Sequence, residues 1–252
     1  MPNDWNASAQ EYSALASSQE QDAYEYEVNF PSIVSLCPKD AKSVLDIGCG
    51  SGEFTAKLSE RSPKIEGCDG AENMLVIARQ KNPDRVFFCW NLEERFPHDE
   101  AEQYDLLVAK LVFMFVKDLE RVAGECARIL APRGSLVVSV IHPLLLFFYN
   151  PPVADNGTSQ SLPEGYFVMQ RVKRAVKGNP KLMFEFIHRT VSEYVNAFTG
   201  QEFVLEHIDE PAMPEDFLTR HPEWRERRFV PQRLNMKFVK VNRRLPVCMI
   251  KV

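Results

Sequence analysis

The sequence lacks the features that identify a metal centre, a disulfide-stabilised domain or a membrane-spanning protein. Its six cysteines are scattered and form no Cys-x-x-Cys pair, whereas metal sites and disulfide frameworks use closer spacings. We therefore expect reduced cysteines that pack in the core, and no bound metal. The apolar run LLLFFY at 144–149 is far shorter than the roughly 20 residues that a membrane-spanning helix needs.

An excess of positive charge is also missing. The formal net charge is −5, whereas nucleic-acid-binding proteins usually carry a basic surface. The N-terminal segment is polar and acidic, unlike a signal peptide. Hydrophobic residues make up 45% of the 252 residues, enough for a sizeable core. We therefore expect a cytoplasmic protein that binds neither nucleic acid nor a membrane.

Between residues 43 and 141, short apolar runs alternate with segments of helical period. The runs are SVLDI, KIEGC, VFFCW, YDLLVA and SLVVSVI, and the segments between them are EFTAKLSERS, AENMLVIARQK and DLERVAGECARIL. Apolar strands separated by helices indicate a parallel sheet covered on both faces. Ligands of such sheets bind at the carboxyl ends of the strands.

The flanking segments follow a different pattern. Residues 1–40 are expected to form an N-terminal helical cap. Residues 142–189 are expected to form an insertion on the substrate side, with two β-rich pieces at 166–176 and 181–191, so that 1–252 is one domain. The segment SEYVNAFTG predicts a helix that ends at Gly200. FVLEHIDE predicts a further strand, and the alternation in RLNMKFVKVN predicts an antiparallel one.

The segment SVLDIGCGSGEFT at 43–55 places Gly48, Gly50 and Gly52 directly after the first apolar run. Glycines allow a tight turn and the close approach of a ligand, and a helix that starts there points its amides at that ligand. Asp46 and Glu53 flank the turn. Two like charges about 4 Å apart cost about 4 kcal/mol near a protein surface. The acids therefore disfavour a pyrophosphate and favour a ligand with an amine or a sulfonium, and an ordinary strand–helix turn is the alternative.

Asp69 ends the second strand in IEGCDGAENML, about 20 residues beyond the glycines. An acid at this distance suits the two hydroxyls of a ribose, although Asp69 is also compatible with a simple helix cap. A ribose without phosphate, combined with a cation, describes S-adenosylmethionine.

With VLDIGCGSGEFT, GCDGAENMLVIAR, YDLLVAKLVFMFVKDL and ILAPRGSLVVSV in this order, the chain resembles the class I S-adenosylmethionine-dependent methyltransferases, from residue 6 to 241. The resemblance implies an α/β fold, Rossmann-like, with a seven-stranded mostly parallel sheet, helices on both faces and an antiparallel last strand. Because WNASAQEY and the late HRTVSEYVNAF are similar to bacterial small-molecule members, it also implies methyl transfer by in-line displacement to a small-molecule acceptor.

The resemblance also implies which residues contact the cofactor. The glycine turn would contact it with its backbone, Asp69 would hold the ribose and Asn91 the adenine, although Asn91 is also compatible with a turn role. Lys110 stands where relatives often carry a small polar residue; it either reaches solvent or meets a carboxylate of the cofactor or of the substrate. The implied cofactor-binding residues are Asp46, Gly48, Cys49, Gly50, Asp69, Gly70, Met74, Asn91, Leu92, Ala109 and Lys110.

Candidates for catalysis and acceptor binding lie where the chain passes the strand ends. His142 follows the fifth strand, and His188 and Arg189 end a strand of the insertion. Arg189 suits a carboxylate or a surface ion pair, and His142 is equally compatible with a buried strand terminator. The candidate substrate-binding residues are Tyr12, Tyr24, Met114, Tyr149 and Tyr166, for which core packing is the alternative.

Three other functions stay open at this point. A site that folds the amino acid tail of S-adenosylmethionine back on itself would promote an intramolecular displacement that releases methylthioadenosine. A cofactor-binding protein without turnover would keep the same glycine turn and ribose acid. A nicotinamide-dependent oxidoreductase is disfavoured by the acids around the glycines.

Overall fold

The computed structural model describes residues 4–20, 22–59, 62–98, 101, 103–148, 165–176 and 179–241. Its strands are β1 (Val44–Ile47), β2 (Ile65–Asp69), β3 (Val86–Cys89), β4 (Tyr104–Lys110), β5 (Leu130–Ile141), β6 (Gln170–Val176), β7 (Asn179–His188), β8 (Phe203–Asp209) and β9 (Arg233–Lys240). Its helices are α1 (Trp5–Ser17), the π-helix η1 (Glu25–Asn29), α2 (Phe30–Leu36), α3 (Glu53–Leu58), α4 (Glu72–Lys81), the 3₁₀ helix η2 (Phe113–Phe115), α5 (Leu119–Ile129), α6 (Pro143–Phe148), α7 (Val191–Thr199), α8 (Glu215–Arg220) and the 3₁₀ helix η3 (Pro222–Arg227).

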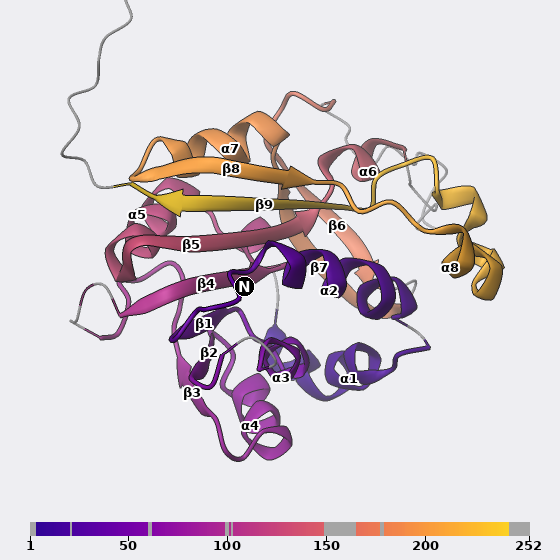
Figure 1. Cartoon of the computed structure of the whole chain (residues 1–252). Coiled ribbons are helices and arrows are strands. Elements are labelled where there is room, and N and C mark those ends of the chain that lie inside the picture. Colours follow the sequence, from indigo (N-terminus) through magenta and orange to yellow (C-terminus); the bar gives the residue numbers. More distant parts are fainter. Residues whose placement is uncertain are drawn as a thin grey trace, which may run out of the picture.

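Seven strands form one sheet in the order β3-β2-β1-β4-β5-β9-β8 (Figure 1). The first five pair in parallel, and β9 runs antiparallel between β5 and β8. The α/β fold with an antiparallel last strand, predicted from the sequence, is therefore confirmed. The strand β5 is longer than expected because it begins at Leu130 and pairs with β4 through an irregular register near Tyr104.

Both faces of the sheet are buried, as the continuous apolar runs predict. In β4, Leu107 and Ala109 pack into a core cluster under α5 and α7. The alternate residues Leu106 and Val108 pack into a second cluster with α2 and α3. The alternation follows from the period of two residues along a strand, and the helices lie on both sides of the sheet in Figure 1.

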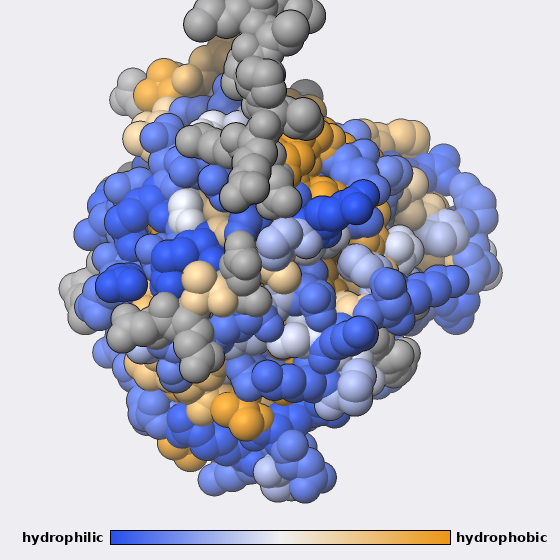
Figure 2. Space-filling model, turned by 60° about the vertical axis from the view of Figure 1, so that its left-hand side comes forward, coloured by the Kyte–Doolittle hydropathy of each residue, from blue (hydrophilic) through white to orange (hydrophobic). Residues whose placement is uncertain are grey.

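The remaining helices and strands lie outside the seven-stranded sheet. The strands β6 and β7 form a separate two-stranded antiparallel sheet, within the 142–189 insertion predicted from the sequence. The helix α7 begins with a capping box, in which Thr190 and Glu193 satisfy each other's backbone amides, and it ends before Gly200 as predicted. The helices α1, η1 and α2 lie within residues 1–40, where a helical cap was expected, whereas α6, α8 and the two 3₁₀ helices were not expected from the sequence. The view in Figure 2 shows a face on which hydrophilic residues prevail and apolar ones gather in separate patches.

Candidate functional site

The carboxyl ends of the parallel strands bring the sequence-predicted site residues to one edge of the sheet. Asp69 ends β2, Lys110 ends β4 and His142 follows β5. The glycine turn follows β1, whose Ile47 pairs with Ala109 of β4. Because parallel strands end at a common edge, residues far apart in the sequence meet here, as expected for a ligand site in an open α/β sheet.

The glycine turn needs glycine for two separate reasons. Gly48, Gly50 and Gly52 all have positive φ angles, of 69°, 54° and 82°, a region that favours glycine. At Gly48 a Cβ atom would lie 2.4 Å from Cγ2 of Val112, so that a side chain does not fit. At Gly50 a Cβ would meet nothing within 4 Å. The turn is therefore packed against the protein at Gly48 and open toward a ligand at Gly50.

Asp69 connects the turn to the next strand. Its Oδ2 accepts a hydrogen bond from the Gly50 amide at 3.0 Å, and its Oδ1 accepts one from the Ala71 amide at 2.8 Å. Burial raises the pKa of Asp69, and the backbone hydrogen bonds act in the opposite direction. A carboxylate has about four lone-pair positions; the amides of Gly50 and Ala71 take two of them, and the Gly70 amide also interacts with the carboxylate. Asp69 therefore also satisfies the first amides of the following segment, and both the ribose and the capping interpretations fit its surroundings.

Asp46 and Glu53, the two acids of the glycine segment, differ in their surroundings. Asp46 is buried and accepts a hydrogen bond from Thr55 Oγ1 at 2.6 Å. Burial raises the pKa of Asp46 to about 7, against the opposing effects of Thr55 and Lys110. Glu53 forms an ion pair with Lys81. The inference that both acids attract a ligand cation is therefore only half supported, because the charge of Glu53 is already neutralised inside the protein.

The other cofactor-binding residues that the resemblance implies lie near the carboxyl edge of the sheet, and their side chains make contacts within the protein. The Cys49 side chain is buried with Leu75 and Phe87, and its thiol donates to the Gly50 carbonyl at 3.7 Å. Met74 packs under α1. Asn91 bonds to Glu94 Oε1 at 2.8 Å and to the Glu93 amide at 3.1 Å, the behaviour of a turn residue. Leu92 packs against the main core, and a Cβ at Gly70 would lie 3.6 Å from the carbonyl of Trp90.

The candidate substrate-binding residues separate into two groups. Met114 is buried beside Phe186, and Tyr166 lies 5.5 Å from the ring of His188. The ring of Tyr12 lies 5.4 Å from that of Trp5 and 6.0 Å from that of Phe184 in β7. Tyr149 lies outside the described residues.

Tyr24 does not fit a substrate role. Its hydroxyl donates to the carbonyl of Pro211 at 3.1 Å, and its buried ring stacks on Trp224 at 5.3 Å. A side chain with its hydroxyl bonded and its ring packed on an outlying cluster stabilises the fold. For Tyr24 we therefore assign the alternative of core packing.

Both ring nitrogens of His142 have partners. The Leu144 amide donates to Nδ1 at 3.1 Å, and Nε2 lies 2.6 Å from Oε1 of Glu210. Because an amide can only donate, Nδ1 carries no proton, and Nε2–H donates to the carboxylate. Burial lowers the pKa of His142, although Glu210 opposes this shift. No lone pair is left for a substrate, so that His142 fits the role of a buried strand terminator better than that of a base.

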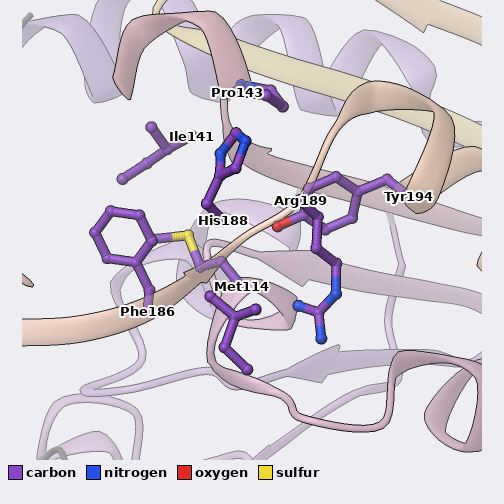
Figure 3. Close-up of a pocket in the computed structure, with 8 residues that line it drawn as sticks. Met114, Ile141, Pro143, Phe186, His188, Arg189 and Tyr194 are labelled. Atoms are coloured by element: carbon purple, nitrogen blue, oxygen red, sulfur yellow. The ribbon is translucent and has the colours of Figure 1, made fainter. Parts of the chain in front are cut away.

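His188 is different, because one of its nitrogens has no partner. Nε2 lies 2.8 Å from the carbonyl oxygen of Tyr166, and since a carbonyl only accepts, Nε2 carries the proton. Nδ1 is buried and, within the part of the chain that the structure describes, has no hydrogen-bond partner. The residue lines a cavity of about 10 Å³ together with Met114, Ile141 and Pro143. Figure 3 shows its ring directed toward Pro143.

Arg189, the neighbour of His188, points the opposite way (Figure 3). Its guanidinium is buried and donates to the carbonyl oxygens of Val116, at 2.6 Å, and Lys117, at 3.0 Å, with Phe113 at 3.5 Å. The catalytic role expected for Arg189 is therefore not supported. The residue ties the start of α7 to the loop after β4.

A buried ionic cluster was missed in the sequence. Arg233 donates from Nε to Glu25 Oε1 at 2.7 Å, and Asn29 donates to Glu25 Oε2 at 2.8 Å. Lys110 Nζ lies 3.9 Å from the same Oε2. Glu25 and Arg233 are 208 residues apart, and no local pattern marks either.

Among the described residues, no group of three or more His, Cys, Asp or Glu residues is arranged to hold a metal ion, and none of the helices there is long and apolar enough to cross a membrane.

The part of the chain that holds this site is similar to known methyltransferases. Residues 45–138, which span the glycine turn, Asp69 and Lys110, match the family model described as a methyltransferase domain. The chain is 36% identical over 114 residues to a demethylmenaquinone methyltransferase of Thermus thermophilus, covering 42% of this chain and 50% of that protein. It is 34% identical over 103 residues to a trans-aconitate 2-methyltransferase of Variovorax paradoxus, covering 40% of this chain and 39% of that protein.

The likeness to these curated relatives is confined to one part of each protein, since the matched region spans half of their length or less. The structural likeness extends further. The crystal structure of an S-adenosylmethionine-dependent methyltransferase from Mesorhizobium loti superposes with a TM-score of 0.69 at 24% identity, covering 87% of this chain and 99% of that one. This likeness shows a shared fold along most of the chain.

Proposed function

We propose that this chain, whose residues 45–138 match the model of a methyltransferase domain, is a class I S-adenosylmethionine-dependent enzyme that transfers a methyl group from S-adenosylmethionine to a small-molecule acceptor. The observation that carries the proposal is the glycine turn, open at Gly50 and tied to the carboxylate of Asp69. A cytoplasmic location, action on a small molecule and a monomeric or homodimeric state belong to the same proposal. The net charge of −5 supports a partner other than nucleic acid.

The residues at the sheet edge fit such a cofactor. The open side of Gly50 admits a ligand to the backbone, and the carboxylate of Asp69 can accept hydrogen bonds from the hydroxyls of a ribose. Asp46, ionised, favours a nearby cation, and the backbone at Ala109 and Lys110 supports the amino acid tail. When bound, the cofactor supplies a methyl group activated by a positively charged sulfur. The protein's contribution is to align the acceptor with it and to exclude water.

Labelled-product analysis tests the proposal directly. The purified chain is incubated with methyl-labelled S-adenosylmethionine and a metabolite extract. A labelled acceptor together with S-adenosylhomocysteine supports methyl transfer. Release of methylthioadenosine supports the intramolecular displacement instead, and tight binding without consumption of the cofactor supports a protein without turnover.

The pKa of Asp46 leads to a prediction for cofactor binding. Below a pKa of about 7 the carboxyl is neutral and does not attract the ammonium of S-adenosylhomocysteine. Affinity should therefore rise with pH by up to about tenfold between pH 6 and pH 8, with a midpoint near pH 7, and level off above about pH 8. Isothermal calorimetry across this range measures the step. The variant Asp46→Asn should remove most of it and keep the low-pH affinity; the same step in both proteins would contradict the assignment.

We propose His188 as the general base for an acceptor that arrives protonated. Because Nε2–H is held by the carbonyl of Tyr166, the lone pair on Nδ1 is free to accept a proton. The cavity beside this nitrogen is lined by the apolar side chains of Met114 and Phe186. A base of this kind contributes about 10²–10⁴-fold to a rate.

The variant His188→Gln retains a donor toward Tyr166 and lacks the base. With the acceptor identified by the labelled product, kcat/KM should fall by about 100-fold or more. Affinity for S-adenosylhomocysteine should not change. His207→Gln, at an exposed histidine of β8, is the matched control. Normal turnover of His188→Gln would exclude the role, and a large drop in melting temperature would indicate a structural one.

A further inference from the structure

Lys110 occupies an unusual position for a lysine. It follows Ala109, the partner of Ile47 in β1, so it lies beside the first residue of the glycine turn. Its side chain is only 17% exposed. The ammonium Nζ lies 5.1 Å from the ring centroid of Phe30 and 5.9 Å from that of Phe54. A lysine usually places its charge in water, whereas this one is held between two aromatic rings at the ligand edge of the sheet.

Among the described residues, this ammonium donates no hydrogen bond. Its nearest acid is Glu25, with Oε2 3.9 Å from Nζ, which is too far for a hydrogen bond. Glu25 bonds instead to Arg233, at 2.6 and 2.7 Å, and to Asn29, at 2.8 Å. In the ranges that the structure describes, no hydrogen bond from Lys110 Nζ is observed. Arg233 therefore forms direct hydrogen bonds with the carboxylate of Glu25. Within the described part of the chain, the three N–H donors of the Lys110 ammonium have no acceptor within hydrogen-bond distance.

The surrounding charges select the kind of anion that would fit. Asp46 and Glu25 both lie close enough to Lys110 to interact with its charge. Two carboxyl groups repel a doubly charged phosphate more than a singly charged carboxylate. A single carboxylate can also form a charge-assisted hydrogen bond with a single ammonium.

We propose that Lys110 anchors a carboxylate-binding site at the carboxyl edge of the sheet. This inference rests on the methyltransferase function proposed above. The carboxylate comes either from the amino acid tail of the cofactor or from an acidic acceptor, and the chemistry of recognition is the same in both cases.

Binding measurements on the full chain and on Lys110→Met distinguish the two sources. The first pair of probes is S-adenosylmethionine and its decarboxylated analogue, which differ only in the carboxylate. If the cofactor supplies the carboxylate, the wild type should prefer the intact molecule by about 10- to 100-fold, and the variant should bind both equally. The second set of probes is malonate, glutarate and tricarballylate added to the complex with S-adenosylhomocysteine. If the acceptor supplies the carboxylate, the variant should lose the binding of these three acids and keep its affinity for both cofactor analogues.

Control variants separate recognition from folding. Lys110→Arg keeps the charge and should retain most of the discrimination, while Lys42→Met removes an exposed lysine near the opposite edge of the sheet and should change nothing. Equal weakening of both cofactor analogues in Lys110→Met, with a lower melting temperature, would overturn the inference in favour of a structural lysine. So would a wild type that neither discriminates the analogues nor binds the acids. A wild type that binds no adenosyl ligand at all would overturn the proposed function together with it.

Discussion

Replacing Asp69 by alanine is expected to lower the affinity for S-adenosylhomocysteine by about 100-fold or more. The carboxylate would lose up to two charge-assisted hydrogen bonds to ribose hydroxyls, each worth about 1.5–3 kcal/mol, and about 1.4 kcal/mol corresponds to a factor of ten. The substitution also leaves the amides of Gly50 and Ala71, now bonded at 3.0 and 2.8 Å, without their partner. Calorimetric titration measures the affinity, and thermal melting measures the cost to the fold.

The effect on the ligand must be separated from the effect on the turn. Asp105 provides a matched control, because its Oδ2 also accepts two backbone amides, from Lys42 at 3.0 Å and Ser43 at 3.2 Å. It lies near the opposite edge of the sheet. Asp105→Ala should therefore destabilise the fold to a similar extent and leave the affinity intact. If Asp69→Ala bound the nucleoside within about twofold of the wild type, Asp69 would be a capping residue only.

The part of the site that could be predicted from sequence is the part that is local. The glycine turn, Asp46 and Asp69 lie on a strand–turn–helix and on the next strand, and their chemistry follows from their types and spacing. The parallel sheet could be predicted because its strands are continuous apolar runs, buried on both faces. The same runs do not reveal that β5 starts at Leu130, because the pairing irregularity opposite Tyr104 depends on the neighbouring strand.

The partners of charged side chains could not be predicted, because they depend on contacts between distant segments. Glu53 and Lys81 are 28 residues apart, yet their ion pair changes the charge at the glycine turn. Glu25 lies in a π-helix and bonds to Arg233 at the start of β9, and this pairing explains why Lys110 is left with unused donors. Sequence patterns give the type of a residue, whereas the free energy of its charge is set by what surrounds it.

The two neighbours His188 and Arg189 show the same limit. Both were expected to act in catalysis because a histidine and an arginine end a strand near the site. In a strand, successive side chains point to opposite sides. The ring of His188, the last residue of β7, lines the cavity beside Met114. Arg189, which follows the strand, also borders this cavity, but its guanidinium extends to the carbonyls of Val116 and Lys117. One step along the chain separates a candidate base from a residue that stabilises the fold.

Replacing Arg189 by methionine is accordingly expected to lower the free energy of unfolding by about 3 kcal/mol. The substitution fills part of the same volume and removes every hydrogen bond of a buried guanidinium, and hydrogen bonds to charged groups contribute about 1.5–3 kcal/mol each. It removes the side-chain donor from the carbonyl groups of Val116 and Lys117, while the Phe113 carbonyl still accepts the Val116 amide at 3.3 Å. For a chain of this length the melting temperature should fall by about 6–10 °C.

A destabilised Arg189→Met that remains folded at low temperature should retain its affinity for S-adenosylhomocysteine and most of its turnover per folded molecule. The control is Arg171→Met in β6, where the guanidinium is 52% exposed and pairs with Glu185 at 2.6 Å. An exposed pair of this kind contributes about 0–1 kcal/mol, so that the melting temperature should hardly change. If Arg189→Met instead melted like the wild type and lost its turnover, the arginine would act on the substrate and its bonds to the carbonyls would be secondary.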